Sequence, residues 1–350
     1  MTAQQHSRRT GNWRHAVATA LVALLALTPS LAPAAGTPQD TVSFGVLRAP
    51  TGALAVVANE KGWFEKAGVK VKMISFAEGG GPAIIQAMGG GEPDIALLNL
   101  ATAVLALSKA SFDVQIIAVP DDPVLALPLL ARAGINSVKD LKGKMVSTPP
   151  NGGQYYLLAQ ILHANGMDFK DIDFRPMPIG QAQAAFVAGR LDAVISSANG
   201  TVLIPKAAPT THVLATGQDL GGSKGDPVVN PDVLVATRKI IETHPDAVKA
   251  FIKAYQGTAV AALQDPSTRK QTTEEIQQYM KSVGAGTQEL DAATKSTDAI
   301  KFYSYDEAKK LLGSEKFRKA IQDQGDYWFE AGVLKSKPDL SKAINSSLMD

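Results

Sequence analysis

Strand-length apolar runs alternate with segments of helical spacing between about residues 42 and 215. The runs VSFGVL at 42–47, DIALL at 94–98 and VQIIAV at 114–119 are examples, with a helical segment at 82–88 between the first two. Further strands are predicted at 69–76, 125–131, 144–148, 172–177, 192–196 and 212–215, and further helices at 53–60, 101–109, 154–165 and 181–188. This alternation predicts an α/β fold with mainly parallel sheets, because each helix returns the chain to the end of the sheet where the next strand begins.

The apolar pattern changes after about residue 235. Ala247, Val248, Phe251, Ile252 and Tyr255 repeat at the spacing of one helical face. From there to residue 350 the chain is therefore predicted to form a helical C-terminal tail.

The first 34 residues have the three parts of a secretory signal peptide. Arginines at positions 8, 9 and 14 form a positive start, residues 16–27 are uncharged and apolar, and Ala32-Pro33-Ala34 supplies small residues for cleavage. The apolar part is too short for a membrane-spanning helix, which needs about 20 residues. We therefore expect cleavage near Ala34 and a periplasmic protein. General secretion is favoured, and the Arg8-Arg9 pair leaves a twin-arginine signal as the alternative.

Composition excludes several classes of protein. Lys and Arg total 35 and Asp and Glu total 33, so the charge is too balanced for a strongly basic nucleic-acid binder. Aromatic residues make up 6 % and do not interleave with basic residues, which disfavours a platform for stacking bases. Cysteine is absent, so a disulfide framework, a Cys-based zinc site and a cysteine nucleophile are excluded.

No catalytic constellation stands out. After the leader, the histidines are His163, His212 and His244, and none lies near another histidine or a cluster of metal ligands. The patterns HExxH, GxSxG, Walker A and GxGxxG are absent. The sequence therefore predicts neither an enzyme nor a metal or cofactor site.

Five segments resemble, in the same order, one family of transport proteins. They are GWFEKAGV at 62–69, DIA at 94–96, SVKDLKGK at 137–144, YLL at 156–158 and AAFVAGRLDA at 184–193. These segments resemble the periplasmic substrate-binding proteins of nitrate/sulfonate/taurine-type ABC importers, a superfamily that includes binders of thiamine-pyrimidine precursors. The resemblance covers about residues 42–265.

The resemblance implies a two-lobed periplasmic binding protein, type II-like, with two crossovers between the lobes. Lobe one comprises residues 41–121 and 219–350, including the helical tail, and lobe two comprises residues 122–218. The implied function is capture of a solute in the interlobe cleft by hinge closure, followed by delivery to an inner-membrane ABC permease and its ATPase. The protein is expected to be a monomer. A binding protein that serves a sensor is an alternative, and a periplasmic enzyme is the least favoured one.

Ligands of open α/β sheets bind beyond the carboxyl ends of strands, next to helix N-termini. Three loops and the end of the strand at 192–196 meet this description. They contain the predicted ligand-binding residues Arg48, Pro50, Thr51, Gly52, Asn99, Ala101, Thr102, Asn151, Gly152, Gly153, Gln154, Tyr155, Ser196 and Asn199. Unpaired N–H groups at helix starts carry partial positive charge, so an oxyanion is the expected guest, with Arg48 as its ion-pair partner.

Structural roles are the alternatives for these residues. Thr51 and Thr102 also suit helix caps, and Tyr155 suits either a stack on the ligand or a place on the lobe surface. Asp121 and Asp122 lie at the first crossover and are predicted to be hinge or rim residues, with contact to a ligand amine as the alternative.

The chain departs from the family pattern after the strand at 192–196. Sulfonate- and taurine-type members often carry Trp-Asp-Pro there, whereas this chain has Ser197-Ala198-Asn199. The carboxylate that would meet a ligand ammonium is missing, which disfavours taurine. Because residues 124–130 are strongly apolar, the predicted ligand is a small organic anion, sulfonate-like, with an apolar or aromatic body. An aromatic carboxylate and a pyrimidine-type heteroaromatic are the alternatives, and Tyr155 and Tyr156 are the nearest stacking candidates for the latter.

Overall fold

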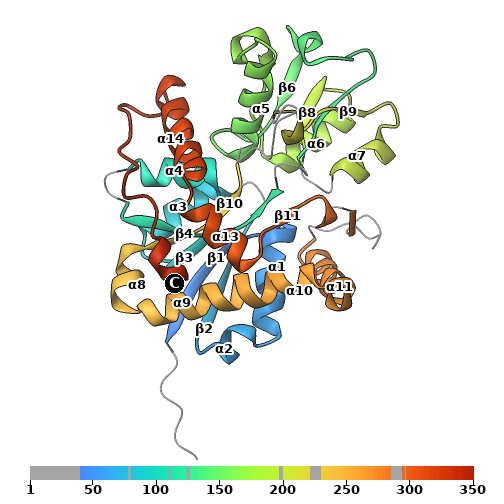
Figure 1. Ribbon diagram of the computed structural model, residues 1–350. Helices are drawn as coiled ribbons and strands as arrows, with labels where there is room; N and C mark the ends of the chain where they lie inside the picture. The colour runs from blue at the N-terminus through green and yellow to red at the C-terminus, as the bar shows by residue number, and fades with distance from the viewer. Residues whose placement is uncertain are drawn as a thin grey trace, which may run out of the picture. The chain divides into compact units, whose positions relative to one another are not determined.

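The strands form two separate sheets (Figure 1). The structure, a computed structural model, describes residues 40–77, 80–109, 112–123, 127–196, 200–220, 230–284, 294–295 and 297–350. The predicted leader and the predicted ligand residue Asn199 lie outside these residues. Within them, no helix has the length and hydropathy that crossing a membrane requires.

The first sheet has the strand order β11-β4-β10-β3-β1-β2. Its strands are β1 (Thr41–Leu47), β2 (Lys70–Phe76), β3 (Ile95–Asn99), β4 (Val114–Asp122), β10 (Asp232–Thr237) and β11 (Lys301–Phe302). β1 pairs in parallel with β2 and β3. β10 lies antiparallel between β3 and β4, and β11 is antiparallel to β4.

The second sheet has the order β7-β6-β8-β5-β9. Its strands are β5 (Leu129–Ala131), β6 (Met145–Ser147), β7 (Asp173–Phe174), β8 (Ala193–Ile195) and β9 (His212–Ala215). β6 is parallel to β7 and β8, whereas β5 is antiparallel to β8 and β9. The chain passes between the sheets twice, from β4 to β5 and from β9 back to β10.

Helices separate most of the strands, which confirms the predicted α/β class. In the first half they are α1 (Pro50–Glu60), α2 (Trp63–Lys66), α3 (Gly81–Gly89), α4 (Leu100–Leu107), η2 (Val138–Leu141), α5 (Gly153–Ala164), η3 (Phe169–Asp171) and α6 (Ile179–Val187). In the second half they are α7 (Gly200–Ala207), η4 (Gly217–Leu220), α8 (Arg238–Thr243), α9 (Pro245–Ala254), η6 (Tyr255–Ala259), α10 (Val260–Gln264), α11 (Pro266–Ser282), α13 (Tyr305–Leu312), α14 (Glu315–Glu330) and η7 (Ser346–Met349).

Two expectations about the strands were wrong. The sheets are mixed rather than mainly parallel, because β10 and β5 each run antiparallel to both neighbours. The sequence analysis also missed β10 as a strand and placed the change of pattern within it. Periodicity gives no direction to a strand, and β10 enters the centre of the first sheet only because the chain returns there from the second sheet.

The helical tail packs on the first sheet, as predicted. The Phe44 ring of β1 lies edge-on to the rings of Phe251, with centroids 4.7 Å apart, and of Tyr255, at 6.1 Å. The end of the chain reaches the same sheet, where the Asn345 N–H donates to the carbonyl of Ile116 in β4 at 2.9 Å. Figure 1 shows α9 and α14 of this tail beside the first sheet. The second sheet has apolar cores of its own.

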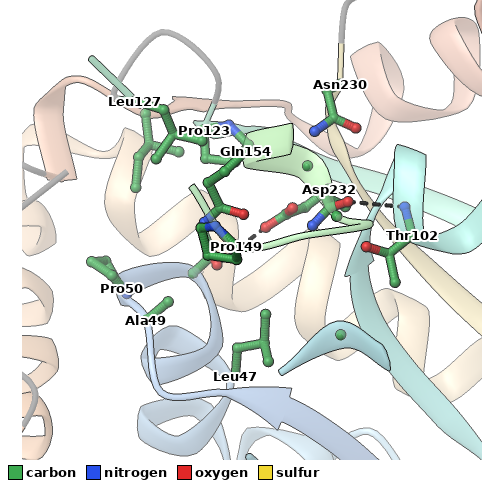
Figure 2. Close-up of a pocket in the computed structure, with 16 residues that line it drawn as sticks. Leu47, Ala49, Pro50, Thr102, Pro123, Leu127, Pro149, Gln154, Asn230 and Asp232 are labelled. Carbon is green, nitrogen blue, oxygen red and sulfur yellow. Dashed lines mark hydrogen bonds between the residues drawn. The ribbon is translucent and has the colours of Figure 1, made fainter. Parts of the chain in front are cut away.

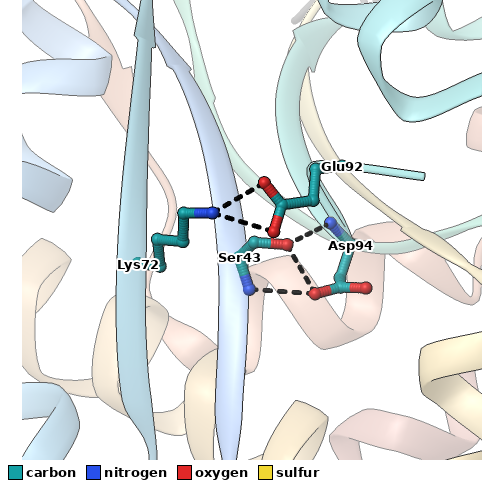
Figure 3. Close-up of polar contacts among 4 residues, drawn as sticks. All are labelled: Ser43, Lys72, Glu92 and Asp94. Carbon is teal, nitrogen blue, oxygen red and sulfur yellow. Dashed lines mark hydrogen bonds and ion pairs between the residues drawn. The ribbon is translucent and has the colours of Figure 1, made fainter. Parts of the chain in front are cut away.

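Two polar contacts tie the amino-terminal side of the first sheet (Figure 3). The Ser43 hydroxyl donates to Asp94 Oδ2 at 2.5 Å and accepts from the Asp94 N–H at 2.9 Å, so that β1 and the start of β3 are held together. Nearby, Lys72 Nζ pairs with Glu92 at 2.7 Å, with side chains 57 % and 53 % exposed. Because exposed ion pairs contribute little, the serine contact should matter more to stability.

Ser43→Ala should lower the free energy of unfolding by about 1 kcal/mol, because it removes both hydrogen bonds of the hydroxyl, whereas the Asp94 carboxylate and N–H keep their bonds to the Ser43 backbone N–H and carbonyl. Lys72→Ala is the control and should change it by less than about 0.5 kcal/mol. Urea unfolding of both variants measures the difference, and equal effects would contradict this account of the contact.

Candidate functional site

A cavity opens where several helices begin (Figure 2). Part of the space inside it is open to solvent. The lining residues are Leu47, Ala49, Pro50, Thr51, Gly81, Asn99, Thr102, Pro123, Leu127, Pro149, Gly152, Gly153, Gln154, Asn230, Asp232 and Ile300. They come from the starts of α1, α3, α4 and α5, from β10, and from the segment between β4 and β5.

The structure brings about half of the predicted ligand-binding residues together. Those in the cavity wall are Pro50, Thr51, Asn99, Thr102, Gly152, Gly153 and Gln154. Those described but outside the wall are Arg48, Gly52, Ala101, Asn151, Tyr155 and Ser196. Asn230 and Asp232 are the polar wall residues that the sequence analysis missed.

The N-terminus of α4 is not available to an anion, contrary to expectation. Its first N–H groups already have partners: Leu100 donates to the carbonyl of Pro231 at 2.8 Å, Ala101 to Asn230 Oδ1 at 2.8 Å, and Thr102 to Asn99 Oδ1 at 3.0 Å. Ala101 is also fully buried, and its carbonyl accepts from the Trp328 indole at 3.1 Å. Thr102 is therefore not the cap of this helix.

The N-terminus of α5 differs, because its cap, Gly152, has no side chain to satisfy the first N–H groups. Among the described residues, Gly153 and Gln154 have no hydrogen-bond partner for these groups, and both residues line the cavity. Asn151 is exposed and forms the turn before the helix, with a φ of 55°. This helix start retains the anion-binding capacity predicted for it.

Arg48 does not reach the cavity. Its N–H donates to the carbonyl of Phe76 at 2.8 Å, which extends the pairing of β1 with β2. Successive side chains along an extended strand point to opposite sides. Because the Leu47 side chain lines the cavity, the Arg48 side chain points away from it. No Lys, Arg or His lines the cavity in the part of the chain that the structure describes.

Tyr155 belongs to an aromatic cluster rather than to the cavity wall. Its ring stacks on Phe169 at 4.3 Å between centroids and on Trp328 at 5.8 Å. Successive helix residues are about 100° apart around the axis. Because Gln154 lines the cavity, Tyr155 lies on a different face of α5. Tyr156 meets the rings of Tyr327 and Trp328 in turn, so neither tyrosine is placed to stack on a ligand.

Gly52 and Ser196 have structural contacts instead. A Cβ on Gly52 would lie 2.1 Å from the carbonyl oxygen of Leu47, so only glycine lets α1 start this close to β1. The Ser196 hydroxyl is fully buried and accepts from Gln183 Nε2 at 3.0 Å. Neither residue lines the cavity.

Three aspartates gather at the cavity. Asp121 and Asp232 are register partners on β4 and β10, and Asp232 is in the wall. Asp121 and Asp122 are the last residues of β4 and are 0 % and 4 % exposed, so they are not residues of an exposed rim. Their predicted hinge role stays a prediction. The Thr51 hydroxyl donates to Asp232 Oδ2 at 3.2 Å.

Burial dominates the electrostatics of this group. It raises the pKa of Asp232 to about 7, with the Asp122 charge acting in the same direction and the Thr51 hydrogen bond opposing it. Burial and the charges of Asp232 and Asp122 raise the pKa of Asp121 well above its usual value. Two neighbouring carboxyls cannot both ionise cheaply in such a site.

The raised pKa of Asp232 makes stability depend on pH. Between about pH 4 and 7 the folded state keeps a proton that the unfolded state has lost, so stability falls as pH rises through this range. Asp232→Asn should therefore gain roughly 1–2 kcal/mol on the wild type between pH 5 and pH 8. Urea unfolding at both pH values tests this, with the exposed Asp113→Asn as control; parallel wild-type and Asp232→Asn profiles would contradict the assignment.

Gly153 sets how closely α5 approaches the first sheet. A Cβ there would lie 2.5 Å from Asn230 Nδ2 and 2.8 Å from Asn99 Cγ, the side chains that cap α4. Gly153→Ala should cost about 1–3 kcal/mol of stability by overpacking. Gly180→Ala, in the first turn of α6 with open space at its Cβ, is the control and should be neutral or slightly stabilising. Thermal unfolding compares them, and an unaffected Gly153→Ala would refute the close contact.

Comparisons with known proteins agree with this architecture. The chain is 26 % identical over 290 residues to a candidate binding protein from Brucella abortus, covering 82 % of this chain and 84 % of the relative. It is 23 % identical over 300 residues to a candidate aliphatic sulfonates-binding protein from Bacillus subtilis, covering 84 % and 83 %.

Among solved structures, the alkanesulfonate-binding protein SsuA from Xanthomonas axonopodis pv. citri bound to MOPS superposes with a TM-score of 0.71. The identity is 18 %, and the match covers 89 % of this chain and 99 % of that protein. The predicted periplasmic-binding-protein fold is thus confirmed. A family model described as NMT1/THI5 like matches residues 50–269, and the chain belongs to this family.

Proposed function

We propose that this protein is an exported solute-binding protein that captures a small organic ligand in the cavity and delivers it to an ABC permease and its ATPase. The observation that carries the proposal is the origin of the cavity wall. Elements of the first sheet contribute Thr51, Asn99 and Asp232, whereas α5, which follows a strand of the second sheet, contributes Gly153 and Gln154. Such a wall couples ligand binding to the relative placement of the two sheets.

The wall suits a ligand with one hydrogen-bond-accepting end. The N–H groups of Gly153 and Gln154, which have no partner among the described residues, lie at the positive end of the α5 dipole. The buried Thr102 hydroxyl likewise has no partner within the described part of the chain. With no basic side chain in the described wall, this end is bound by N–H and O–H groups. A sulfonate or carboxylate head fits this set of donors.

The rest of the wall is apolar. Leu47, Leu127 and Ile300 line it together with prolines 50, 123 and 149. These side chains suit the apolar or aromatic body expected from the sequence. A bare inorganic anion such as nitrate would leave this surface uncovered, so an organic ligand is favoured.

Closure of the site follows from the two connections between the sheets. We infer that these connections act as hinges for the lobes proposed at residues 41–121 with 219–350 and at 122–218. The close contact of Gly153 with Asn99 and Asn230 supports a closed arrangement, since a larger residue would hold α5 away from the first sheet.

A pyrimidine-type ligand is the second candidate, because the superfamily that the sequence resembles includes binders of thiamine-pyrimidine precursors. It lacks a stacking partner in the described wall, because Tyr155 and Tyr156 are engaged with other aromatic rings. The sulfonate or carboxylate assignment therefore has the better support from the geometry.

The test is a thermal-shift screen of protein purified from the periplasm, whose intact mass also shows whether residues 1–34 were removed. Alkyl and aryl sulfonates, taurine, nitrate, aromatic carboxylates and thiamine pyrimidines form the panel. We expect an organic sulfonate or carboxylate to stabilise the protein, by about 2.7 kcal/mol at a hundred times its dissociation constant. Nitrate should give little shift.

Two glutamine variants control this screen. Gln154→Ala removes a wall side chain and should weaken binding. Gln181 lies in the first turn of α6, away from the cavity, so Gln181→Ala should bind as the wild type does. A flat panel, together with no retained ligand in native mass spectrometry, would refute the proposed function.

A further inference from the structure

The most unusual feature of the cavity is a pair of carboxyls in its floor. Asp121 and Asp232 are directly opposite each other on antiparallel strands, which puts their side chains on the same face of the sheet, a few ångströms apart. Asp232 lines the cavity (Figure 2), and the fully buried Asp121 lies beside it in the sheet.

Among the described residues, no basic side chain lines the cavity beside this pair. Lys301 of β11 is the register partner of Asp122 rather than of Asp121. Its ammonium lies 5.1 Å from the centroid of the Tyr303 ring. The Tyr255 hydroxyl, which approaches from η6, donates to the carbonyl of Thr51 at 3.0 Å. The negative charge is therefore left facing the cavity.

One buried polar group of the cavity wall lacks a partner. The Thr102 hydroxyl has no hydrogen-bond partner among the described residues, although the residue is 1 % exposed and lines the same cavity. Asp121 and Asp232 share a side-chain hydrogen bond, so the pair holds one proton and carries its charge on Asp232. A buried polar atom without a partner is costly, so the Thr102 hydroxyl indicates a site completed by a ligand.

We propose that the bound solute carries a cationic nitrogen, an ammonium or an amidinium, and that the Asp232 carboxylate binds it. This inference rests on the proposed solute-binding function and names the charge that such a solute carries. The cation neutralises the single negative charge that the Asp121–Asp232 pair carries.

The ligand then has two ends of opposite character. Its cationic nitrogen meets Asp232 on β10, and its accepting head meets the N–H groups of Gly153 and Gln154 at the start of α5. The sequence analysis disfavoured an amine because the family's carboxylate after β8 is replaced in this chain. Asp232 provides a carboxylate from a different strand of a different sheet.

Pairs of probes that differ in the nitrogen test this directly. We would compare 2-aminoethanesulfonate with 2-hydroxyethanesulfonate, 4-(aminomethyl)benzoate with 4-(hydroxymethyl)benzoate, and 4-amidinobenzoate with 4-carbamoylbenzoate, by calorimetry at pH 7.5. At least one cationic member should bind about 30-fold or more tightly than its neutral isostere, since loss of one partner of a buried charge pair has effects of this size. Equal binding within every pair overturns the inference, as does failure of all cationic members to bind.

Variants assign the effect to Asp232. Asp232→Asn should abolish the preference for the cationic member, whereas Asp113→Asn should keep it, because Asp113 is exposed and pairs with Arg238 at the far end of the same strands. Should Asp232→Asn fail to fold by circular dichroism, Thr51→Val, which removes the hydroxyl that holds Asp232, should reduce the preference at least threefold. A preference that survives in a folded Asp232→Asn protein overturns the assignment.

This experiment separates the two proposals. Binding of neutral-bodied sulfonates or carboxylates with no gain from a cationic nitrogen leaves the solute-binding function standing and overturns the inference. Absence of binding by every solute, charged or not, overturns both.

Discussion

The antiparallel insertion of β10 between β3 and β4 is the constraint on which the site depends. The strand completes the core of the first sheet, and its start carries Asn230 and Asp232 to the ends of β3 and β4. Because β10 follows the second connection between the sheets, the same stretch of chain supplies that connection, a cap of α4 and part of the cavity wall. A change in its register would shift all three together.

Capping decides which helix starts can serve a ligand. The first N–H groups of α4 donate to Asn99, Asn230 and a backbone carbonyl. Protein oxygens therefore already complement the dipole of this helix. α5 begins at a glycine pair with no capping side chain, so its first N–H groups have no partner among the described residues. Two helix starts that look alike in sequence therefore differ in chemistry, because a residue 129 positions away supplies one of the caps.

The carboxyls in the floor illustrate the same division between stability and function. A buried, unpaired acid is costly to the folded protein, and hydrophobic replacements would pack the sheet without that cost. Asp121 and Asp232 lie at the point where the cavity meets the sheet. Binding of the proposed cation would offset this cost.

The sequence by itself determined the α/β class, the family, the packing role of the tail and the wall residues that follow strands along the chain, such as Thr51, Asn99 and Gln154. Local periodicity and loop position contain that information. Only the tertiary structure decided the direction of β10, the loss of the α4 N-terminus to Asn230, the exclusion of Arg48 and Tyr155 from the wall, and the pairing of Asp121 with Asp232. Each of these depends on a contact between residues far apart in the chain, whose register and facing side are set by packing rather than by local pattern.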